Sequence, residues 1–248
     1  MKDAIQWVRS FMHVVVIYGM MPVIGLLWLP AALRSKDGAI AACRTWATFA
    51  MWTARWMVGI RTEVRGTPPA GEVLIAAKHQ SFLDIIIIYA AVPRGKFIMK
   101  KELAKAPVLG WYARRIDCVV VDRGKRAEAV RHMVNEVAAG RVDPGQLIIY
   151  PQGTRILPGV KAPYKVGAAI LYAELNQPCV PVACNVGLFW PRRGIMRKPG
   201  VAVVEFLDPI PPGMTQDAFM ETLEEEVETR SNALMAEAGF HPAEEETE

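Results

Sequence analysis

The stretch VLIAAKHQSFLDIIIIYAA, residues 73–91, predicts a strand, a short polar loop and a helix in direct succession. The run Val73–Ala76 is apolar and followed by a further alanine, which is typical of a buried strand. Residues 82–91 are almost wholly apolar and long enough for a helix. Because α/β folds place their functional groups in the loop that joins a strand to its following helix, the loop around His79 is the first candidate site.

The same alternation continues along the chain beyond residue 91. Short runs rich in Val and Ile are separated by helical patterns, and an acidic helix that ends near Gly239 closes the series. This order predicts an α/β fold with a mixed, mainly parallel sheet flanked by helices. The expected strands are 73–76, 96–99, 118–122, 146–150, 179–183 and 201–206, and the expected helices are 82–91, 126–139, 164–175 and 215–238.

Composition and charge narrow the functional classes. The chain has 248 residues, of which 52% are hydrophobic and 22% charged, and its four cysteines form no CxxC pair. A disulfide scaffold, a zinc ribbon and a thioredoxin-type site are therefore disfavoured, and a reducing compartment is expected. Residues 94–131 hold eleven Lys and Arg against four acids, whereas residues 205–248 hold thirteen acids against Arg230 alone. This asymmetry predicts that the middle of the chain meets an anion.

Residues 10–33 form an uncharged apolar run that is long enough to cross the hydrocarbon core of a bilayer. A membrane anchor is the favoured interpretation, and a buried core helix and a cleaved signal peptide are the alternatives. Pro22, with glycines on either side, predicts a kink or a re-entrant turn. The basic residues that follow the run favour a cytoplasmic location for the rest of the chain: Arg34, Lys36, Arg44 and Arg55.

A second N-terminal helix is expected over residues 39–59. Its aromatic residues Trp46, Phe49, Trp52 and Trp56 recur every three or four positions, so we expect them on one face, at the lipid boundary. The alternative is an amphipathic helix that covers the soluble core. The expected organisation is a membrane-associated helical segment (1–60), an α/β domain (61–240) and an acidic tail (241–248).

His79 and Asp84 are the candidate catalytic pair. Their spacing is poor for contact within one helix, but it suits a histidine in the loop and a carboxylate in the first helical turn. A carboxylate on one ring nitrogen fixes the tautomer and makes the other nitrogen a better base. The alternative is a capping histidine with an unrelated aspartate. Ser81 lies outside any G-x-S-x-G elbow, so we expect it to cap the helix rather than act as a nucleophile.

Two further strand ends carry polar groups suited to an anion. The strand over 146–150 leads into YPQGTR, residues 150–155, where Gly153 permits close approach and Thr154 and Arg155 offer donors for phosphate or carboxylate. Arg123 follows the strand over 118–122. The alternative for residues 150–155 is an ordinary loop with a surface arginine, and the alternative for Arg123 is a solvated helix start. No P-loop, dinucleotide fingerprint or H-E-x-x-H motif is present, which disfavours nucleotide binding and common zinc hydrolysis.

These motifs, taken in order, make the chain resemble the glycerolipid acyltransferase family. That family's first motif, often NHQSxxD, stands here as KHQSFLD, residues 78–84. Its second motif ends in an arginine after an apolar strand, as in VVVDR, residues 119–123. Its third, usually FPEGTR, is YPQGTR, and its fourth, an apolar strand with a central proline, is CVPVA, residues 179–183. The resemblance spans about residues 70–210.

The resemblance implies a membrane-associated O-acyltransferase that moves an acyl chain from a thioester to a lysophospholipid hydroxyl, here that of 1-acyl-glycerol-3-phosphate. His79 would be the general base and Asp84 would orient it. The donor would be acyl carrier protein or coenzyme A, at the cytoplasmic side of the inner membrane. No metal, bound cofactor or nucleic-acid partner is expected. The residues implied to hold the acceptor's phosphate are Arg123, Gln152, Gly153, Thr154 and Arg155, with Lys100, Lys101 and Lys105 adding positive charge.

Two positions depart from the family pattern, and alternatives remain. Lys78 replaces the common asparagine, which we interpret as minor, and Gln152 replaces the usual glutamate. Gln152 keeps the shape of the glutamate side chain and one hydrogen-bond acceptor, so the change could be tolerated. Alternatively, it marks a different acyl-accepting substrate, such as a lyso-ornithine lipid. A peripheral lipid-binding protein without activity is the alternative from another class, although binding alone needs neither His79 nor Asp84.

Overall fold

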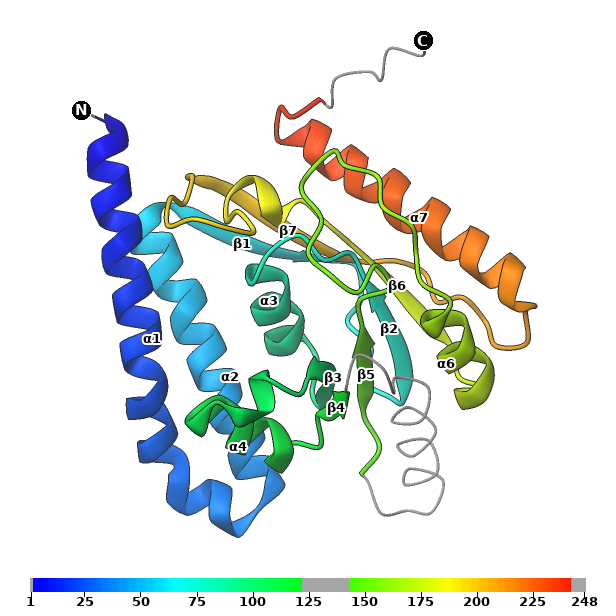
Figure 1. Ribbon diagram of the computed structural model, residues 1–248, viewed down its shortest axis with the longest axis horizontal. Coiled ribbons are helices and arrows are strands. Elements are labelled where there is room, and N and C mark those ends of the chain that lie inside the picture. The colour runs from blue at the N-terminus through cyan, green and yellow to red at the C-terminus, as the bar shows by residue number, and fades with distance from the viewer. Residues whose placement is uncertain (1, 122–142, 242–248) are drawn as a thin grey trace.

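The computed structural model describes residues 2–121 and 143–241. Helices and strands alternate through most of this chain after two N-terminal helices (Figure 1). The helices are α1 (Lys2–Arg34), α2 (Lys36–Thr53), α3 (Leu83–Ala91), α4 (Pro107–Arg115), α6 (Gly167–Leu175) and α7 (Gln216–Glu237), with the short helical turns η1 (Ala54–Val58), η2 (Leu103–Lys105) and η3 (Val186–Leu188). The strands are β1 (Ile60–Arg65), β2 (Val73–Ala77), β3 (Gly95–Lys100), β4 (Val119–Val121), β5 (Gln146–Ile149), β6 (Cys179–Cys184) and β7 (Gly200–Phe206).

The strands form one mixed sheet in the order β1-β7-β6-β2-β5-β3-β4. Strands β6, β2, β5, β3 and β4 run parallel, with Ile75 opposite Val180 on one side and Ile148 on the other. The pair β1 and β7 runs parallel to each other and antiparallel to the rest, because β6 and β7 pair antiparallel. This arrangement confirms the predicted α/β fold with a mainly parallel sheet.

Helices cover both faces of the sheet, so the central strands are apolar on both sides. Ile75 and Ala77 of β2 pack in a cluster with α1, α2 and α3, whereas Leu74 and Ala76 pack on the other face with α6 and α7. Successive side chains of a strand point to opposite faces of the sheet. Because both faces are covered by helices, β2 is apolar at every position. The layers are visible on either side of the sheet in Figure 1.

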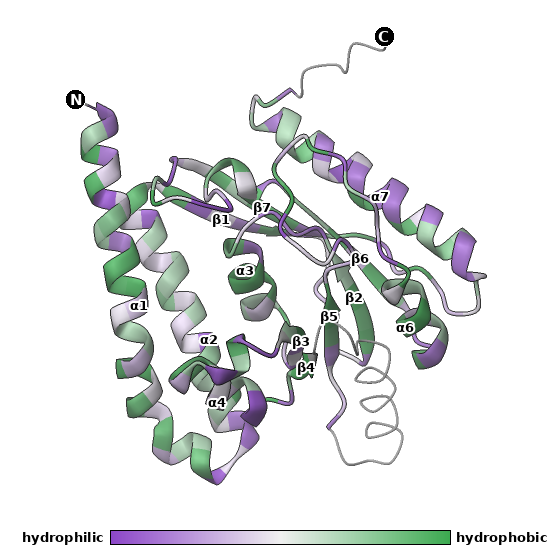
Figure 2. Ribbon diagram, viewed as in Figure 1, coloured by the Kyte–Doolittle hydropathy of each residue, from purple (hydrophilic) through white to green (hydrophobic). Residues whose placement is uncertain are grey.

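Helix α1 is continuous through Pro22, so the expected re-entrant turn is absent from this helix. It is the one helix in the described chain that is long and apolar enough to cross a membrane, judged by length and composition (Figure 2). Three of its polar side chains face the protein: Ser10 and His13 are fully buried, and Gln6 donates to the carbonyl oxygens of Val58 and Arg197.

The four aromatic residues of the second helix do not share one face, which corrects the expectation. Trp46 is half-buried, and its Nε1 donates to the carbonyl oxygen of Ile17 at 2.9 Å. Trp52 and Trp56 are 59% and 66% exposed. The cause is helical geometry, since six residues place Trp46 about 120° around the helix from Trp52.

Several boundaries differ from those expected. The strand Ile60–Arg65 and the helix Pro107–Arg115 were not predicted, and α6 begins at Gly167 rather than at residue 164. Strand β1 is an edge strand with alternating charged residues, which a search for apolar runs overlooks. The helix expected over 126–139 and the tail over 242–248 lie outside the described residues.

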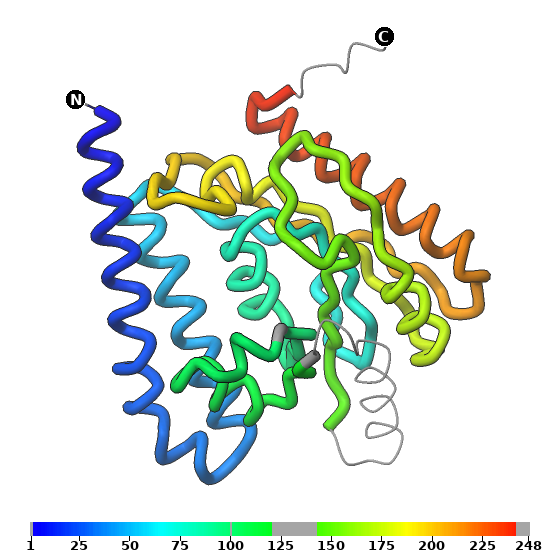
Figure 3. The backbone as a smooth tube through the Cα atoms, viewed as in Figure 1, coloured from blue at the N-terminus to red at the C-terminus, as the bar shows by residue number. Residues whose placement is uncertain are grey.

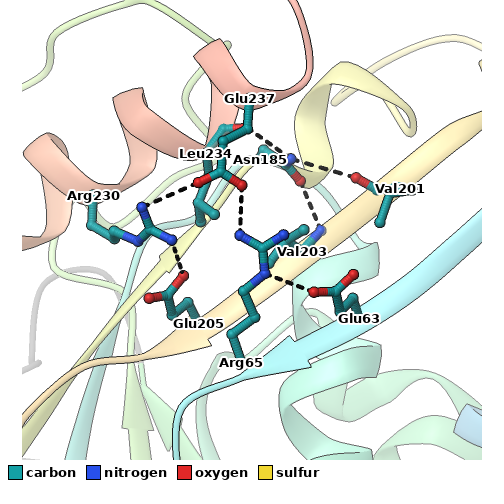
Figure 4. Close-up of polar contacts among 9 residues, drawn as sticks. All are labelled: Glu63, Arg65, Asn185, Val201, Val203, Glu205, Arg230, Leu234 and Glu237. Atoms are coloured by element: carbon teal, nitrogen blue, oxygen red, sulfur yellow. Dashed lines mark hydrogen bonds and ion pairs between the residues drawn. The ribbon is translucent and has the colours of Figure 1, made fainter.

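Polar contacts hold the C-terminal part of α7 on the sheet (Figure 4). Glu237 accepts from Arg65 of β1 at 2.6 Å and pairs with Arg230, which in turn donates to Glu205 of β7 at 2.7 Å. Beside them, buried Asn185 accepts from the backbone N–H of Val203 and donates to the carbonyl oxygen of Leu234 (Figure 4). These contacts fix α7 in place relative to β6 and β7.

Replacing Asn185 tests this attachment. Asn185→Leu keeps the volume but leaves the Val203 N–H and the Leu234 carbonyl without their side-chain partner in the interior. We expect a loss of about 2 kcal/mol or more in the free energy of unfolding. The melting temperature should fall by about 4–8 °C. Val201→Thr, an exposed change on β7, is the control, and equal melting temperatures for both variants would contradict the assignment.

Candidate active site

Two loops meet at the carboxyl edge of the sheet because β2 and β5 are parallel neighbours. The first loop joins β2 to α3 and carries His79, and the second joins β5 to α6 and carries Gly153–Arg155. The backbone N–H of Ile156 donates to the carbonyl oxygen of His79 at 2.8 Å. The two motifs are therefore in direct contact, although they lie far apart in sequence.

Asp84 organises the first loop. One carboxylate oxygen, Oδ1, lies 2.9 Å from Nδ1 of His79. The other, Oδ2, accepts from the backbone N–H groups of Gln80 and Ser81 at 2.9 and 2.8 Å. Asp84 is fully buried, so all of these contacts form away from water. The same side chain thus orients the histidine and closes the loop at the start of α3.

His79 is held with one nitrogen free. Because Nδ1 donates to Asp84, its proton is fixed there, and Nε2 keeps a lone pair. Nε2 has no hydrogen-bond partner among residues 2–121 and 143–241, and the side chain is 13% exposed. The arrangement is that of a general base with an orienting carboxylate.

Tyr150 completes the setting of the histidine, and the sequence analysis did not single it out as a functional residue. Its ring stacks on the imidazole of His79, with the ring centroids 4.0 Å apart. Burial, and then the negative charge of Asp84, raise the pKa of Tyr150 far above its usual range. The phenol therefore stays neutral beside the pair. The sequence signal that could have identified Tyr150 is its position directly after the strand β5, at the start of the second loop.

Ser81 serves the backbone of the loop. Its hydroxyl oxygen accepts from the N–H of Leu83, the first residue of α3, at 3.1 Å. The expected N-cap position is corrected, because Phe82 is the N-cap of α3 and Ser81 precedes it. Ser81 is fully buried, which leaves its hydroxyl inaccessible to a substrate.

The second loop presents the hydroxyl of Thr154 and the guanidinium of Arg155, and the guanidinium of Arg192 lies beside them. Gly153 has a φ of 68°, a left-handed conformation that glycine adopts without strain. Arg155 donates to the carbonyl oxygen of Arg192 at 3.1 Å, and Arg192 donates to Thr154 Oγ1 at 3.3 Å. Arg192, from the segment between β6 and β7, was missed, because nothing in its local sequence marks it.

The other residues expected to bind the anion, within the described part of the chain, lie outside the group formed by Gly153, Thr154 and Arg155. Gln152 is 3% exposed, and its amide contacts the carbonyl oxygen of Ala162 and the carboxylate of Glu228. Lys105 is exposed in η2, which follows β3 at the same edge of the sheet. The backbone of Lys100 and Lys101 lies at that same edge. Arg123 lies outside the described residues.

Comparisons with known proteins identify the family of the chain. The family model described as "Acyltransferase" matches residues 61–185, which is half of the chain and contains both loops. The chain belongs to the acyltransferase family. Among curated relatives, the 1-acyl-sn-glycerol-3-phosphate acyltransferase of Pseudomonas aeruginosa is 29% identical over 163 residues, covering 65% of this chain and 63% of that protein.

The homologous protein in Saccharomyces cerevisiae, with the same name, is 29% identical over 195 residues, covering 75% of this chain and 64% of that protein. The matches thus span somewhat less than two thirds of these relatives. The crystal structure of the 1-acyl-sn-glycerophosphate (LPA) acyltransferase PlsC from Thermotoga maritima is 19% identical, with a TM-score of 0.79 over 95% of this acyltransferase and 100% of that chain. That likeness shows a shared fold.

The four cysteines of this acyltransferase are free thiols that are buried to different extents: Cys43 and Cys118 are half-buried, and Cys179 and Cys184 are buried. Cys179 and Cys184 are fully buried, and burial raises the pKa of Cys43 to about 12 and that of Cys118 to about 11. Thiolate is the nucleophilic form of cysteine, so these groups are poor nucleophiles at neutral pH. In the described residues, no group of three or more His, Cys, Asp or Glu side chains is arranged to hold a metal.

Thiol labelling tests this interior placement. At pH 7.5, the native protein should react with a thiol reagent such as Ellman's reagent far more slowly than the urea-unfolded protein, in which all four thiols react. Pre-incubation with N-ethylmaleimide should likewise leave the activity of the native protein unchanged. Rapid labelling of Cys179 or Cys184 in the native state, detected by mass spectrometry, would contradict their burial.

Proposed function

We propose that this protein is an O-acyltransferase that moves a fatty acyl chain from a thioester to the sn-2 hydroxyl of 1-acyl-glycerol-3-phosphate, giving phosphatidic acid. The observation that carries the proposal is the His79–Asp84 pair, held with Nε2 of His79 free beside the Gly153–Arg155 loop. Membership of the acyltransferase family supports the reaction class. The names of the relatives support the acceptor.

The chemistry follows from the free nitrogen of His79. Nε2 removes the proton of the acceptor hydroxyl as its oxygen attacks the thioester carbonyl. The carbonyl carbon then releases the thiolate of the donor, which takes the proton from the imidazolium. The negative charge of Asp84 stabilises the imidazolium between these two steps. General base catalysis of this type contributes roughly 100- to 10,000-fold.

The acceptor's phosphate would lie against the second loop. Thr154 offers a hydroxyl, and Arg155 offers a guanidinium that suits phosphate oxygens. Gly153 lets the loop backbone approach the ligand. Arg123, Lys100 and Lys105 would add positive charge from the neighbouring strand ends, and the donor would be a thioester of acyl carrier protein or coenzyme A.

The outer surface of α1 supports a membrane location. The basic residues that follow its apolar run, from Arg34 to Arg55, favour the cytoplasmic side of the inner membrane for the α/β part. The helix buries Ser10 and His13 and exposes many large apolar side chains, whereas a helix on a soluble protein turns its apolar face to the core. Leu26 and Leu27 are 68% and 75% exposed, and Trp7 and Phe11 stack on each other at the surface. An exposed apolar face of this size marks a contact with lipid or protein.

An acyl-transfer assay with purified protein tests the reaction and its base together. A panel of lysophosphatidic acid, lysophosphatidylcholine and lyso-ornithine lipid is offered with radiolabelled acyl carrier protein and coenzyme A thioesters. We expect transfer to lysophosphatidic acid. His79→Ala should lower kcat by about 100-fold or more. Asp84→Asn should also lose activity, because the orienting charge is gone.

Melting curves of the two variants serve as the control for folding. Near-normal turnover by folded His79→Ala would overturn the assignment of the base. A wild-type protein that acylates lyso-ornithine lipid and ignores lysophosphatidic acid would overturn the acceptor and leave the mechanism standing.

Charge on α1 should abolish membrane binding without unfolding the protein. Leu26→Glu/Leu27→Glu places two carboxylates on the most exposed part of the apolar face, where burial in lipid is costly. We expect the variant to stay in the supernatant in liposome flotation while wild type floats. Val166→Glu, an exposed change beside α6, is the control. Equal flotation of all three proteins would place the membrane contact elsewhere.

A further inference from the structure

Three side chains beside the two loops converge on one carboxylate, Glu228 of α7. Lys78 Nζ lies 2.6 Å from each of its oxygens. The hydroxyl of Tyr164 donates to Oε1 at 2.9 Å, and Nε2 of Gln152 lies 3.4 Å from the same atom. Burial and the charge of Glu228 raise the pKa of Tyr164, so its hydroxyl stays protonated as a donor.

The places of these partners in the chain link Glu228 to both motifs. Lys78 directly precedes His79, and Gln152 directly precedes Gly153. Tyr164 lies at the far end of the second loop, which runs beside α7 before it enters α6 (Figure 3). One carboxylate therefore contacts the residue before the base, the residue before the Gly-Thr-Arg motif and the end of that motif's loop.

Removing the Glu228 carboxylate should destabilise the folded protein, because the ammonium group of Lys78 that it pairs with is buried. The Lys78 side chain is 2% exposed, and that of Glu228 is 23% exposed. A buried ammonium without its partner is strongly destabilising, so the lysine and its loop would have to move if the carboxylate were removed. Oε1 of Gln152 is also buried, with no partner among the described residues, so the glutamine is held through its amide nitrogen.

Helix α7 is a firm support for this carboxylate. Two residues beyond Glu228, Arg230 is tied to β7, and Glu237 is tied to Arg65 of β1 (Figure 4). Leu223 and Val227, on the preceding turns, are fully buried against the sheet. Glu228 is thus presented from a helix that is attached directly to the sheet.

We infer that Glu228 is a positioning residue of the active site: its charge, acting through Lys78 and Gln152, sets the two motif loops relative to each other. This inference rests on the acyl transfer proposed above. Glu228 does not touch the reacting atoms. It acts on turnover because a displacement of about 1 Å between the base and the bound acceptor can cost about 100-fold in rate.

A charge relocation separates positioning from mere stability. Glu228→Gln removes the carboxylate, and Gln152→Glu adds a second one against the first. The double variant Gln152→Glu/Glu228→Gln moves the single carboxylate across the 3.4 Å contact and keeps an anion beside Lys78. Glu225→Gln is the matched control, because it makes the same charge change at an exposed position of α7.

The measurement is kcat and KM for the acceptor, per folded molecule, at least about 15 °C below each melting temperature. We expect each single variant to lose about tenfold or more in kcat, as a displacement smaller than 1 Å would give. The double variant should recover to within about threefold of wild type, and Glu225→Gln should match wild type. A role limited to stability would lower the melting temperature and leave kcat per folded molecule unchanged.

The outcomes that overturn the inference are specific. Equal kcat for Glu228→Gln and Glu225→Gln would do so, and so would a double variant no faster than the slower single variant. If Glu228→Gln does not fold, Gln152→Glu is compared with the double variant alone. A higher kcat for the double variant supports the inference, and an equal or lower kcat overturns it. Failure of the proposed function is distinguishable, because the wild-type protein would then transfer no acyl group to any acceptor.

Discussion

The site depends on the burial of one carboxylate, that of Asp84. A buried charge is tolerated only when its oxygens are fully paired, and here the loop supplies the pairs: two backbone N–H groups and the ring of His79. The loop must therefore fold back over the start of α3. That fold gives the histidine its direction, and the register of β2 beside β5 brings the second motif to it. The contacts that orient His79 are therefore the same contacts that stabilise the loop.

Much of this arrangement could be predicted from sequence. The short apolar runs gave the central strands, because strands covered on both faces need no polar alternation. The spacing of His79 and Asp84 allowed a contact, and the resemblance of the motifs favoured it; the structure shows this contact at 2.9 Å. These features are local, or they follow from the rule that strand ends carry the sites.

The features that sequence missed depend on distant partners. Lys78 was interpreted as a minor departure, but it is a buried cation whose partner lies 150 residues away. Gln152 was expected beside the anion site, yet its side chain points to α7. Tyr164 was assigned to a helix, but it lies before that helix and donates to the same carboxylate. In each case the decisive contact joins elements that only the tertiary fold brings together.

The tie between the two loops has a consequence for altering the protein. The N–H of Ile156 and the carbonyl of His79 are backbone groups, so no side-chain substitution short of proline at 156 deletes that bond. The stretch that follows, residues 157–161, is largely exposed. It can therefore be randomised in a library while both ends stay pinned, at Ile156 and at Tyr164. A selection on such a library would vary the surface beside the candidate site and leave the His79–Asp84 pair unchanged.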